Sequence, residues 1–253
     1  MNKRTSIGIK TDDDLNILRD AGKILFDIFE ELKCSLKIGI TTIELDQVAE
    51  GLIKKNQVKP AFKGYRGYPA CVCTSINEEV VHGIPKDKAV QSGDILSLDL
   101  GIIYKDYYAD MAYSVGIGSI SEELQRLLIV TEKALMRGIE QVSAGNHLSD
   151  ISHAVQSYAE DHGFSVVRDF VGHGIGRFLH EEPEIPNFGP PHQGPILKPG
   201  MVFCVEPMVN VGDWKTKILD DGWTVVTEDG KASAHFEHMI AVTEKGPKIL
   251  TVR

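Results

Sequence analysis

The sequence predicts an α+β protein built from two similar halves related by a pseudo-twofold axis, each with an antiparallel sheet covered by helices. Two internal alignments predict this duplication. Gly39 recurs as Gly145, 106 positions later, and each glycine lies between two helix-like segments. The run from Gly93 to Asp99 recurs 107 positions later, from Gly200 to Glu206. Because each run ends with an acid after an apolar strand-like stretch, we expect acids of the two halves to meet at the axis.

The first half contains two expected helices. Residues 12–36 carry apolar side chains at spacings of three and four, the pattern of an amphipathic helix. Thr11 supplies an N-cap, and the three aspartates after it suit the positive end of the helix dipole. Thr41 and Glu44 have the spacing of a capping box, which predicts a second helix from this point.

The second half repeats this order. Residues 121–142 have helical spacing, Gly145 follows, and Ser149 is expected to open the next helix. No Ser/Gly-rich linker lies between the halves, so we expect a single domain with internal duplication, with halves of roughly 1–118 and 119–253.

Composition limits the classes of function. The chain has 253 residues, with 27 basic against 36 acidic side chains, and a net charge of −9 argues against a general nucleic-acid binder. No segment approaches the roughly 20 apolar residues of a membrane helix, and no signal peptide is expected at the start. The cysteines form no C-x-x-C pair, which favours free thiols in a reducing cytoplasm. They are Cys34, Cys71, Cys73 and Cys204.

A β-hairpin is expected from residues 95–103 and 107–115. With a two-residue turn between them, Asp99 lies opposite Ala112, and Asp110 shares its face as a diagonal neighbour. A register shift of two residues would pair the two acids directly, whereas a shift of one would separate them. The prediction of a shared site therefore depends on the turn.

Five side chains are candidate metal ligands: Asp99, Asp110, His173, Glu206 and Glu237. Any of these acids alone is more simply explained as a solvated or salt-bridged residue. Together, four acids in apolar segments are costly to bury as charges unless cations pair with them. The run Gly-His-Gly-Ile-Gly around His173 leaves room for an imidazole to reach a cleft. Such a ligand set suits Mn, Fe, Co or Zn, and two ions about 3.5–4 Å apart can act on one hydrolysed bond.

These residues, in this order and spacing, resemble the type I methionine aminopeptidases of bacterial length, in the pita-bread metallopeptidase family. Asp99 and Asp110 match the Asp-x10-Asp pair of that family. Residues 170–183 resemble its most specific signature, and residues 200–207 and 234–238 match the remaining ligand segments. The resemblance covers nearly the whole chain and implies the pita-bread fold.

The resemblance also implies roles for the ligands. Asp99 would chelate one ion, His173 and Glu206 the other, and Asp110 and Glu237 would bridge the two. A hydroxide bridging the ions would attack the carbonyl of an N-terminal methionine. Glu206 would also carry the proton to the leaving amine, so it is a catalytic residue as well as a ligand.

Further residues have roles only by resemblance. His82 stands where the family places a histidine that contacts the scissile amide, and His180 where another steadies the carbonyl oxygen. As isolated histidines, both would be assigned to the surface or the core. A monovalent cation is implied near Asn77 and Ser233. The implied methionine pocket consists of Phe62, Tyr65, Tyr68, Cys73, Leu179 and Trp223.

The implied activity is removal of the initiator methionine from nascent proteins, with preference for a small second residue. The implied partners are nascent N-termini, with a transient ribosome contact and without membrane or specific nucleic acid, and the family leans toward monomers. One alternative is an Xaa-Pro aminopeptidase or prolidase, which shares fold and ligands but usually carries an additional N-terminal domain. A non-enzymatic pita-bread binding module is the other alternative, although the retained ligands argue against it.

Overall fold

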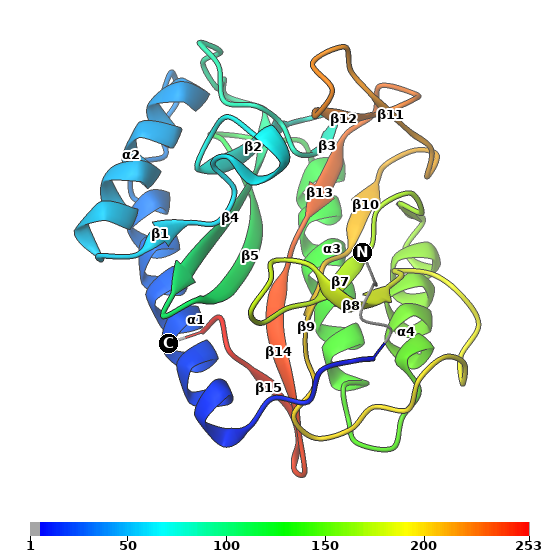
Figure 1. The fold of residues 1–253 in the computed structure, drawn as a ribbon. Coiled ribbons are helices and arrows are strands. Elements are labelled where there is room, and N and C mark those ends of the chain that lie inside the picture. The colour runs from blue at the N-terminus through cyan, green and yellow to red at the C-terminus, as the bar shows by residue number, and fades with distance from the viewer. Residues whose placement is uncertain (1–5, 253) are drawn as a thin grey trace.

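The computed structural model describes residues 6–252. Its helices lie on the outside of the molecule and the strands run between them (Figure 1). Helices α1 (Asp12–Lys33) and α2 (Thr42–Lys55) flank one half, and α3 (Glu122–Glu140) and α4 (Leu148–Asp161) flank the other. The expected order of two helices in each half is therefore confirmed.

The helices of the first half begin where the capping residues predict. The side chain of Thr11 accepts a hydrogen bond from Asp14 N, and the Asp14 carboxylate accepts one from Thr11 N. Thr41 and Glu44 form the same reciprocal pair at the start of α2. Helix α1 ends at Lys33, three residues before the predicted end. Beyond it, Ser35 N donates to Leu32 O and Leu36 N donates to Lys33 O, so the hydrogen bonds join residues three apart instead of four.

The prediction that Ser149 opens the fourth helix is wrong by two residues. His147 is the N-cap, and its backbone N–H donates to the Asp150 carboxylate over 2.8 Å. The Ser149 hydroxyl instead accepts from Gln193 N at 2.7 Å, which ties the helix to a later loop. A tertiary partner has taken the side chain that local pattern assigned to the cap.

The strands of residues 6–252 form four sheets with antiparallel pairing. In the first sheet, one edge of β4 pairs with β1 and then β2, and its other edge pairs with β5. The strands of this sheet are β1 (Lys59–Pro60), β2 (Val72–Ile76), β4 (Ile95–Tyr104) and β5 (Tyr107–Gly116). A short 3₁₀ turn, Tyr65–Gly67, lies between β1 and β2.

The second half contributes a five-stranded sheet, and two three-stranded sheets complete the fold. The largest has the order β15 (Gly246–Ile249), β14 (His238–Thr243), β9 (Val202–Val205), β7 (Gly172–Gly174) and β8 (Glu181–Ile185). One small sheet has the order β13 (Ser233–His235), β10 (Met208–Asn210) and β6 (Ser165–Val166). The other has the order β11 (Thr216–Ile218), β12 (Val225–Thr227) and β3 (Glu79–Val81).

The predicted hairpin register is confirmed. Asp99 lies opposite Ala112, and Asp110 lies opposite Gly101. The turn residues Lys105 and Asp106 have φ values of 48° and 62°, the left-handed pair that a two-residue turn of this twist requires. The turn therefore fixes the two acids on one face of the sheet.

Equivalent hydrogen bonds in the two halves support the internal duplication. Gly39 N donates to Val90 O at 2.8 Å, and Gly145 N donates to Leu197 O at 3.0 Å. Both glycines have a left-handed backbone, with φ of 88° and 96°. The segment before the second helix of each half is thus tied in the same way to the segment before its central strand.

The two halves meet along β5 and the chain between β13 and β14. Glu237 N donates to Ala112 O at 3.0 Å, and the Ser114 hydroxyl exchanges hydrogen bonds with both backbone groups of His235. One apolar core packs under α1 and α2, and a second packs under α3 and α4. Within residues 6–252, none of the helices combines the length and apolar character of a membrane span.

Candidate active site

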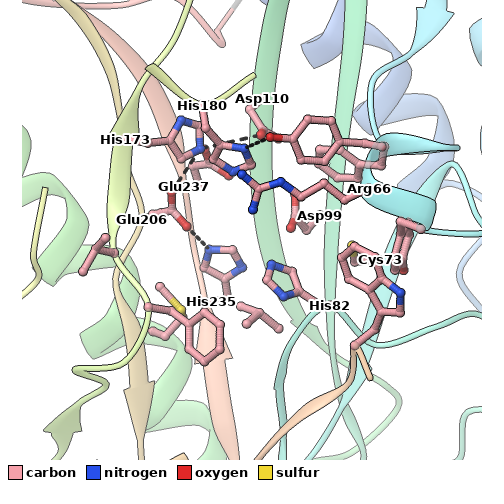
Figure 2. A pocket seen from close by; sticks show the side chains of 18 residues that line it. Arg66, Cys73, His82, Asp99, Asp110, His173, His180, Glu206, His235 and Glu237 are labelled. Atoms are coloured by element: carbon pink, nitrogen blue, oxygen red, sulfur yellow. Dashed lines mark hydrogen bonds and ion pairs between the residues drawn. The ribbon is translucent and has the colours of Figure 1, made fainter. Parts of the chain in front are cut away.

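A cavity of about 280 Å³ opens where the two halves meet (Figure 2). It brings together all five candidate metal ligands and most other predicted site residues. Those on its wall are Asp99, Asp110, His173, Glu206, Glu237, His82, His180, Phe62, Tyr65, Tyr68, Cys73 and Trp223. Sequence reasoning assigned no role to six further lining residues: Arg66, Val81, Phe170, Val171, Met208 and His235.

The ligand candidates come from separate segments: Asp99 from β4, Asp110 from β5, His173 from β7, Glu206 from the residue after β9, and Glu237 from the chain between β13 and β14. Carboxylate oxygens of Asp99, Asp110 and Glu237 lie within 4.8 Å of one another. His173, on β7, places Nε2 at 3.4 Å from Glu206 Oε1 and 4.0 Å from Asp110 Oδ2. The first half thus supplies two acids, and the second half supplies two acids and the imidazole.

Burial makes this cluster expensive as a set of bare charges. It raises the pKa of Asp110 to about 7 and holds those of Asp99, Glu206 and Glu237 well above their usual range, with repulsion between the acids adding to the shift of these three. Within residues 6–252, one buried oxygen on each of these three finds no hydrogen-bond partner. Divalent cations would satisfy these oxygens and offset the repulsion, so the residues fit a metal centre.

The backbone around His173 is shaped by glycines. A Cβ on Gly172 would lie 2.4 Å from Cys204 O, and one on Gly174 would lie 2.2 Å from Glu182 O, so neither position tolerates a side chain. His173 Nδ1 lies 3.0 Å from Gly174 O, and donation through Nδ1 leaves the Nε2 lone pair for a metal. Burial lowers the pKa of His173 to about 4, which keeps the ring neutral.

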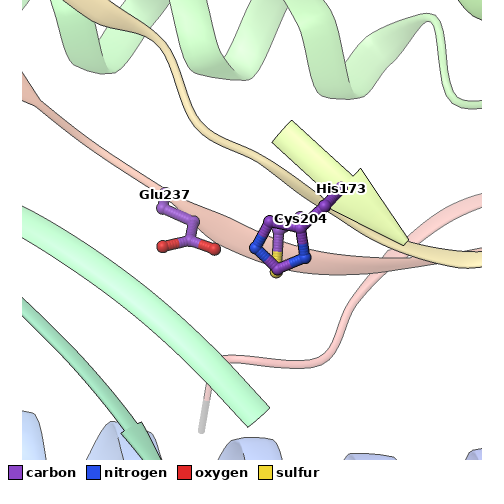
Figure 3. Close-up of side chains that lie close together, drawn as sticks. All are labelled: His173, Cys204 and Glu237. Carbon is purple, nitrogen blue, oxygen red and sulfur yellow. The ribbon is translucent and has the colours of Figure 1, made fainter. Parts of the chain in front are cut away.

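Cys204 on β9 lies directly opposite His173 on the paired strand β7 (Figure 3). Its sulfur, a His173 nitrogen and a Glu237 oxygen all lie within 4.8 Å of one another. The thiol is fully buried and does not line the cavity, and burial raises its pKa. Sequence reasoning treated this cysteine only as a free thiol, although its position two residues before Glu206 on a strand predicts the same face.

Two histidines complete the polar wall. His180 Nδ1 lies 2.7 Å from the Tyr65 hydroxyl, and burial and the nearby His173 lower its pKa to about 3. His82 has a left-handed backbone, with φ of 60°, and its ring meets that of Trp223 edge-on at 6.3 Å. Holding a non-glycine residue in this conformation costs about 1–3 kcal/mol, and residues strained in this way cluster at functional sites.

An apolar slot adjoins the acids. The rings of Tyr68 and Trp223 meet edge-on at 5.1 Å. Phe62 packs where Gly101 has no side chain, since a Cβ there would lie 2.8 Å from the Phe62 ring. Leu179 is not among the residues on the wall of this cavity; its side chain packs in the first core, and its place in the methionine pocket stays a prediction.

His235 is the main polar residue that sequence reasoning missed. Its Nε2 lies 3.7 Å from Glu206 Oε2, and burial lowers its pKa to about 3. Its spacing of two from Glu237 was the available signal. The structure also places Asn77 and Ser233 together, since Ser233 N donates to Asn77 O at 2.9 Å.

Comparison with known proteins assigns the chain to a family. Residues 16–244 match the family described as metallopeptidase family M24. The chain belongs to metallopeptidase family M24. Membership implies divalent metal cofactors, and the clustered acids and His173 are candidate ligands for them.

Several relatives of this M24 metallopeptidase resemble it over nearly their whole length. It is 52% identical over 242 residues to methionine aminopeptidase 1 of Bacillus subtilis (strain 168), covering 96% of this chain and 98% of the relative. It is 50% identical over 244 residues to methionine aminopeptidase of Clostridium perfringens (strain 13 / Type A), covering 96% and 98%. The resemblance inferred from the sequence is confirmed.

Solved structures of related proteins have the same fold as this chain. The crystal structure of methionine aminopeptidase from Rickettsia prowazekii matches with a TM-score of 0.96 and 43% identity, covering 98% of this chain and 100% of that one. Prolidase from Pyrococcus furiosus matches with a TM-score of 0.78 and 23% identity, covering 97% of this chain and 65% of that one. The second likeness is one of fold alone, and together they confirm the pita-bread architecture of the M24 family.

Proposed function

We propose that this M24 metallopeptidase is a methionyl aminopeptidase that removes the initiator methionine of nascent proteins and prefers a small second residue. One observation carries the proposal: the apolar slot of Tyr68, Trp223 and Phe62 opens directly onto the buried cluster of acids and His173. Burying an unbranched apolar side chain in such a slot contributes about 1.5–3 kcal/mol to binding. The relatives named methionine aminopeptidase support the same conclusion.

The metal ligands follow from the donor set. Asp99 would hold one ion, His173 and Glu206 the other, and Asp110 and Glu237 would lie between them. When bound, two divalent ions polarise the scissile carbonyl and make a water molecule acidic enough to attack it near neutral pH. Oxygen and imidazole donors accept Mn, Fe, Co or Zn, and availability decides among them.

The side chains around the ions handle protons and orientation. Glu206 would take the proton of the attacking water and deliver it to the leaving amine. His180 is neutral, and donation by the Tyr65 hydroxyl to Nδ1 would place its ring proton on Nε2, ready to stabilise the developing oxyanion. His82, from the opposite wall, would orient the peptide nitrogen.

The remaining assignments complete this proposal. The chain would act in the cytoplasm as a monomer and as one catalytic domain, with halves of roughly 1–118 and 119–253. Its substrates would be nascent N-termini, met in transient contact with the ribosome. A monovalent cation would bind near Asn77 and Ser233, whose backbones are already hydrogen-bonded to each other.

The alternatives are not favoured. Xaa-Pro dipeptidase from Bacillus anthracis shares the fold with 24% sequence identity, whereas the two relatives that are 52% and 50% identical to this chain are named methionine aminopeptidase. Four buried acids with raised pKa serve no purpose in a binding module, because neutral residues of similar volume would pack at lower cost.

The test is amino-acid release from Met-Ala-Ser by metal-free protein, titrated separately with Mn, Fe(II), Co and Zn. We expect metal-dependent release of methionine and little release from Ala-Pro peptides. If no methionine appears with any metal while two ions are bound, the proposed activity is wrong. Faster cleavage of the Ala-Pro peptides would instead indicate an Xaa-Pro peptidase.

A further inference from the structure

A second, larger cavity adjoins the first. Its volume is about 760 Å³, and four residues line both cavities: Arg66, Val171, His173 and His180. It then runs along β8, past Glu182 and Glu184. If the N-terminal residue of a substrate occupies the first cavity, the chain beyond the scissile bond leaves through the second and passes Arg66 at the junction.

Arg66 is the cation at this junction without a carboxylate partner. Among residues 6–252 it makes neither an ion pair nor a side-chain hydrogen bond, and its guanidinium lies over the ring of Tyr65, 5.4 Å from the centroid. Of the other cations of the second cavity, Lys10 pairs with Glu181 at 2.5 Å, and Arg177 lies closer to an aromatic ring, 3.9 Å from the centroid of Tyr107. A contact with a ring face leaves the N–H groups at the edge of the exposed Arg66 guanidinium available to an anion.

The backbone holds Arg66 in a costly conformation. Its φ of 48° and ψ of 22° are left-handed, and hydrogen bonds across the turn fix them, with Gly64 N donating to Tyr68 O at 2.8 Å. Figure 2 shows the Arg66 side chain among those lining the first cavity, on the side of His180. Such strain in a non-glycine residue is typical of ligand clamps, where it fixes the direction of a side chain.

We propose that Arg66 is a specificity-determining residue that favours substrates with an acidic side chain at the third position; this rests on the proposed aminopeptidase function. The first residue occupies the slot and the second lies at the scissile bond, so the third is the first to reach the junction. A guanidinium binds a carboxylate through two parallel hydrogen bonds, whereas it has no comparable partner in an amide. Because the pair is exposed to solvent, we expect a two- to fivefold preference.

Glu182 and Glu184 limit this preference to the junction. Both are exposed, line only the second cavity and make no ion pair within residues 6–252. They repel acids farther along the path. An aspartate moved from the third to the fifth residue should therefore lose its advantage.

The experiment compares kcat/KM for Met-Ala-Asp-Ser-Ser and Met-Ala-Asn-Ser-Ser, both C-terminally amidated so that no other carboxylate is present. We expect the Asp peptide to be favoured two- to fivefold in the parent, with the ratio falling to about one in Arg66→Gln. Added salt should shrink the parent ratio. Lys63→Gln is the matched control, because Lys63 is a nearby cation that pairs with Glu50 and lines neither cavity.

Equal rates for the two peptides in the parent would overturn the proposal, as would a preference that survives Arg66→Gln. A ratio lost equally in Lys63→Gln would also overturn it, because general charge would then explain the effect. These outcomes leave the aminopeptidase function intact. Absence of methionine release from every peptide would instead refute the proposed function, and this inference with it.

Discussion

Asp110→Asn should make the metal-free protein more stable and the metal-loaded protein less so. Asp110 is buried among three other acids, and its Oδ1 accepts a hydrogen bond from Met111 N at 3.0 Å. An asparagine keeps that acceptor and nearly the same volume. The substitution therefore removes one charge from the cluster and little else.

The size of the effect follows from the pKa of Asp110. A value of about 7 against the usual 3.8 corresponds to roughly 4 kcal/mol of destabilisation of the charged form at high pH. Replacing buried charges by neutral groups of similar volume typically stabilises by about 1–4 kcal/mol. For a chain of this size, each kcal/mol raises the melting temperature by about 2–4 °C.

The assay is thermal unfolding at pH 8 with chelator and with added Mn, together with metal analysis. We expect the chelated variant to melt at least about 2 °C above the chelated parent. In the parent, free ion at 100 times its Kd stabilises by about 2.7 kcal/mol, a gain that the variant should largely lose. A chelated variant less stable than the parent, or one that retains both ions, would refute the reasoning.

Asp46→Asn is the matched control for this experiment. Asp46 is also buried with a raised pKa, but its carboxylate accepts hydrogen bonds from Cys71 N and Val72 N. It does not line the cavity. Its substitution should leave metal content unchanged and should not raise the melting temperature.

Two further predictions test the site. His180→Ala should lower kcat/KM for Met-Ala-Ser by about 100-fold, as for loss of an oxyanion donor, with metal content unchanged; hydrolysis at the parent rate would remove His180 from the mechanism. The unfolding free energy of the chelated protein should fall from about pH 7 to 8. The acids with raised pKa, Asp110 among them, hold protons in the folded state that the unfolded state has lost, and above about pH 7 the buried histidines are neutral in the folded state and mostly neutral in the unfolded state. A melting temperature that rises over this range would contradict that assignment.

Much of the site was predictable because its acids follow local rules. The turn at Lys105 and Asp106 fixes the hairpin register, and the register places Asp99 and Asp110 on one face. The glycines around His173 mark close backbone approaches that any residue with a Cβ would block. In each case a short stretch of chain determines the geometry.

The errors arise where distant segments decide. Ser149 bonds to Gln193 rather than capping its helix. Arg66 reaches the cavity from a turn whose local pattern gives no sign of this destination, whereas the spacing of two between His235 and Glu237 was a signal that went unused.

The duplication accounts for why acids of the two halves meet, whereas the candidate imidazole ligand, His173, comes from the second half. In the first sheet, Ser97 of β4 lies opposite Ser75 of β2. The equivalent residue of β9, at an offset of 107, is Cys204, and it lies opposite His173. The first half could supply no imidazole from this strand, and its neighbouring Cys73 instead lines the cavity. The second half thus supplies candidate ligands from β7 and from the end of β9, whereas β2 of the first half contributes Cys73 to the apolar slot that would select methionine.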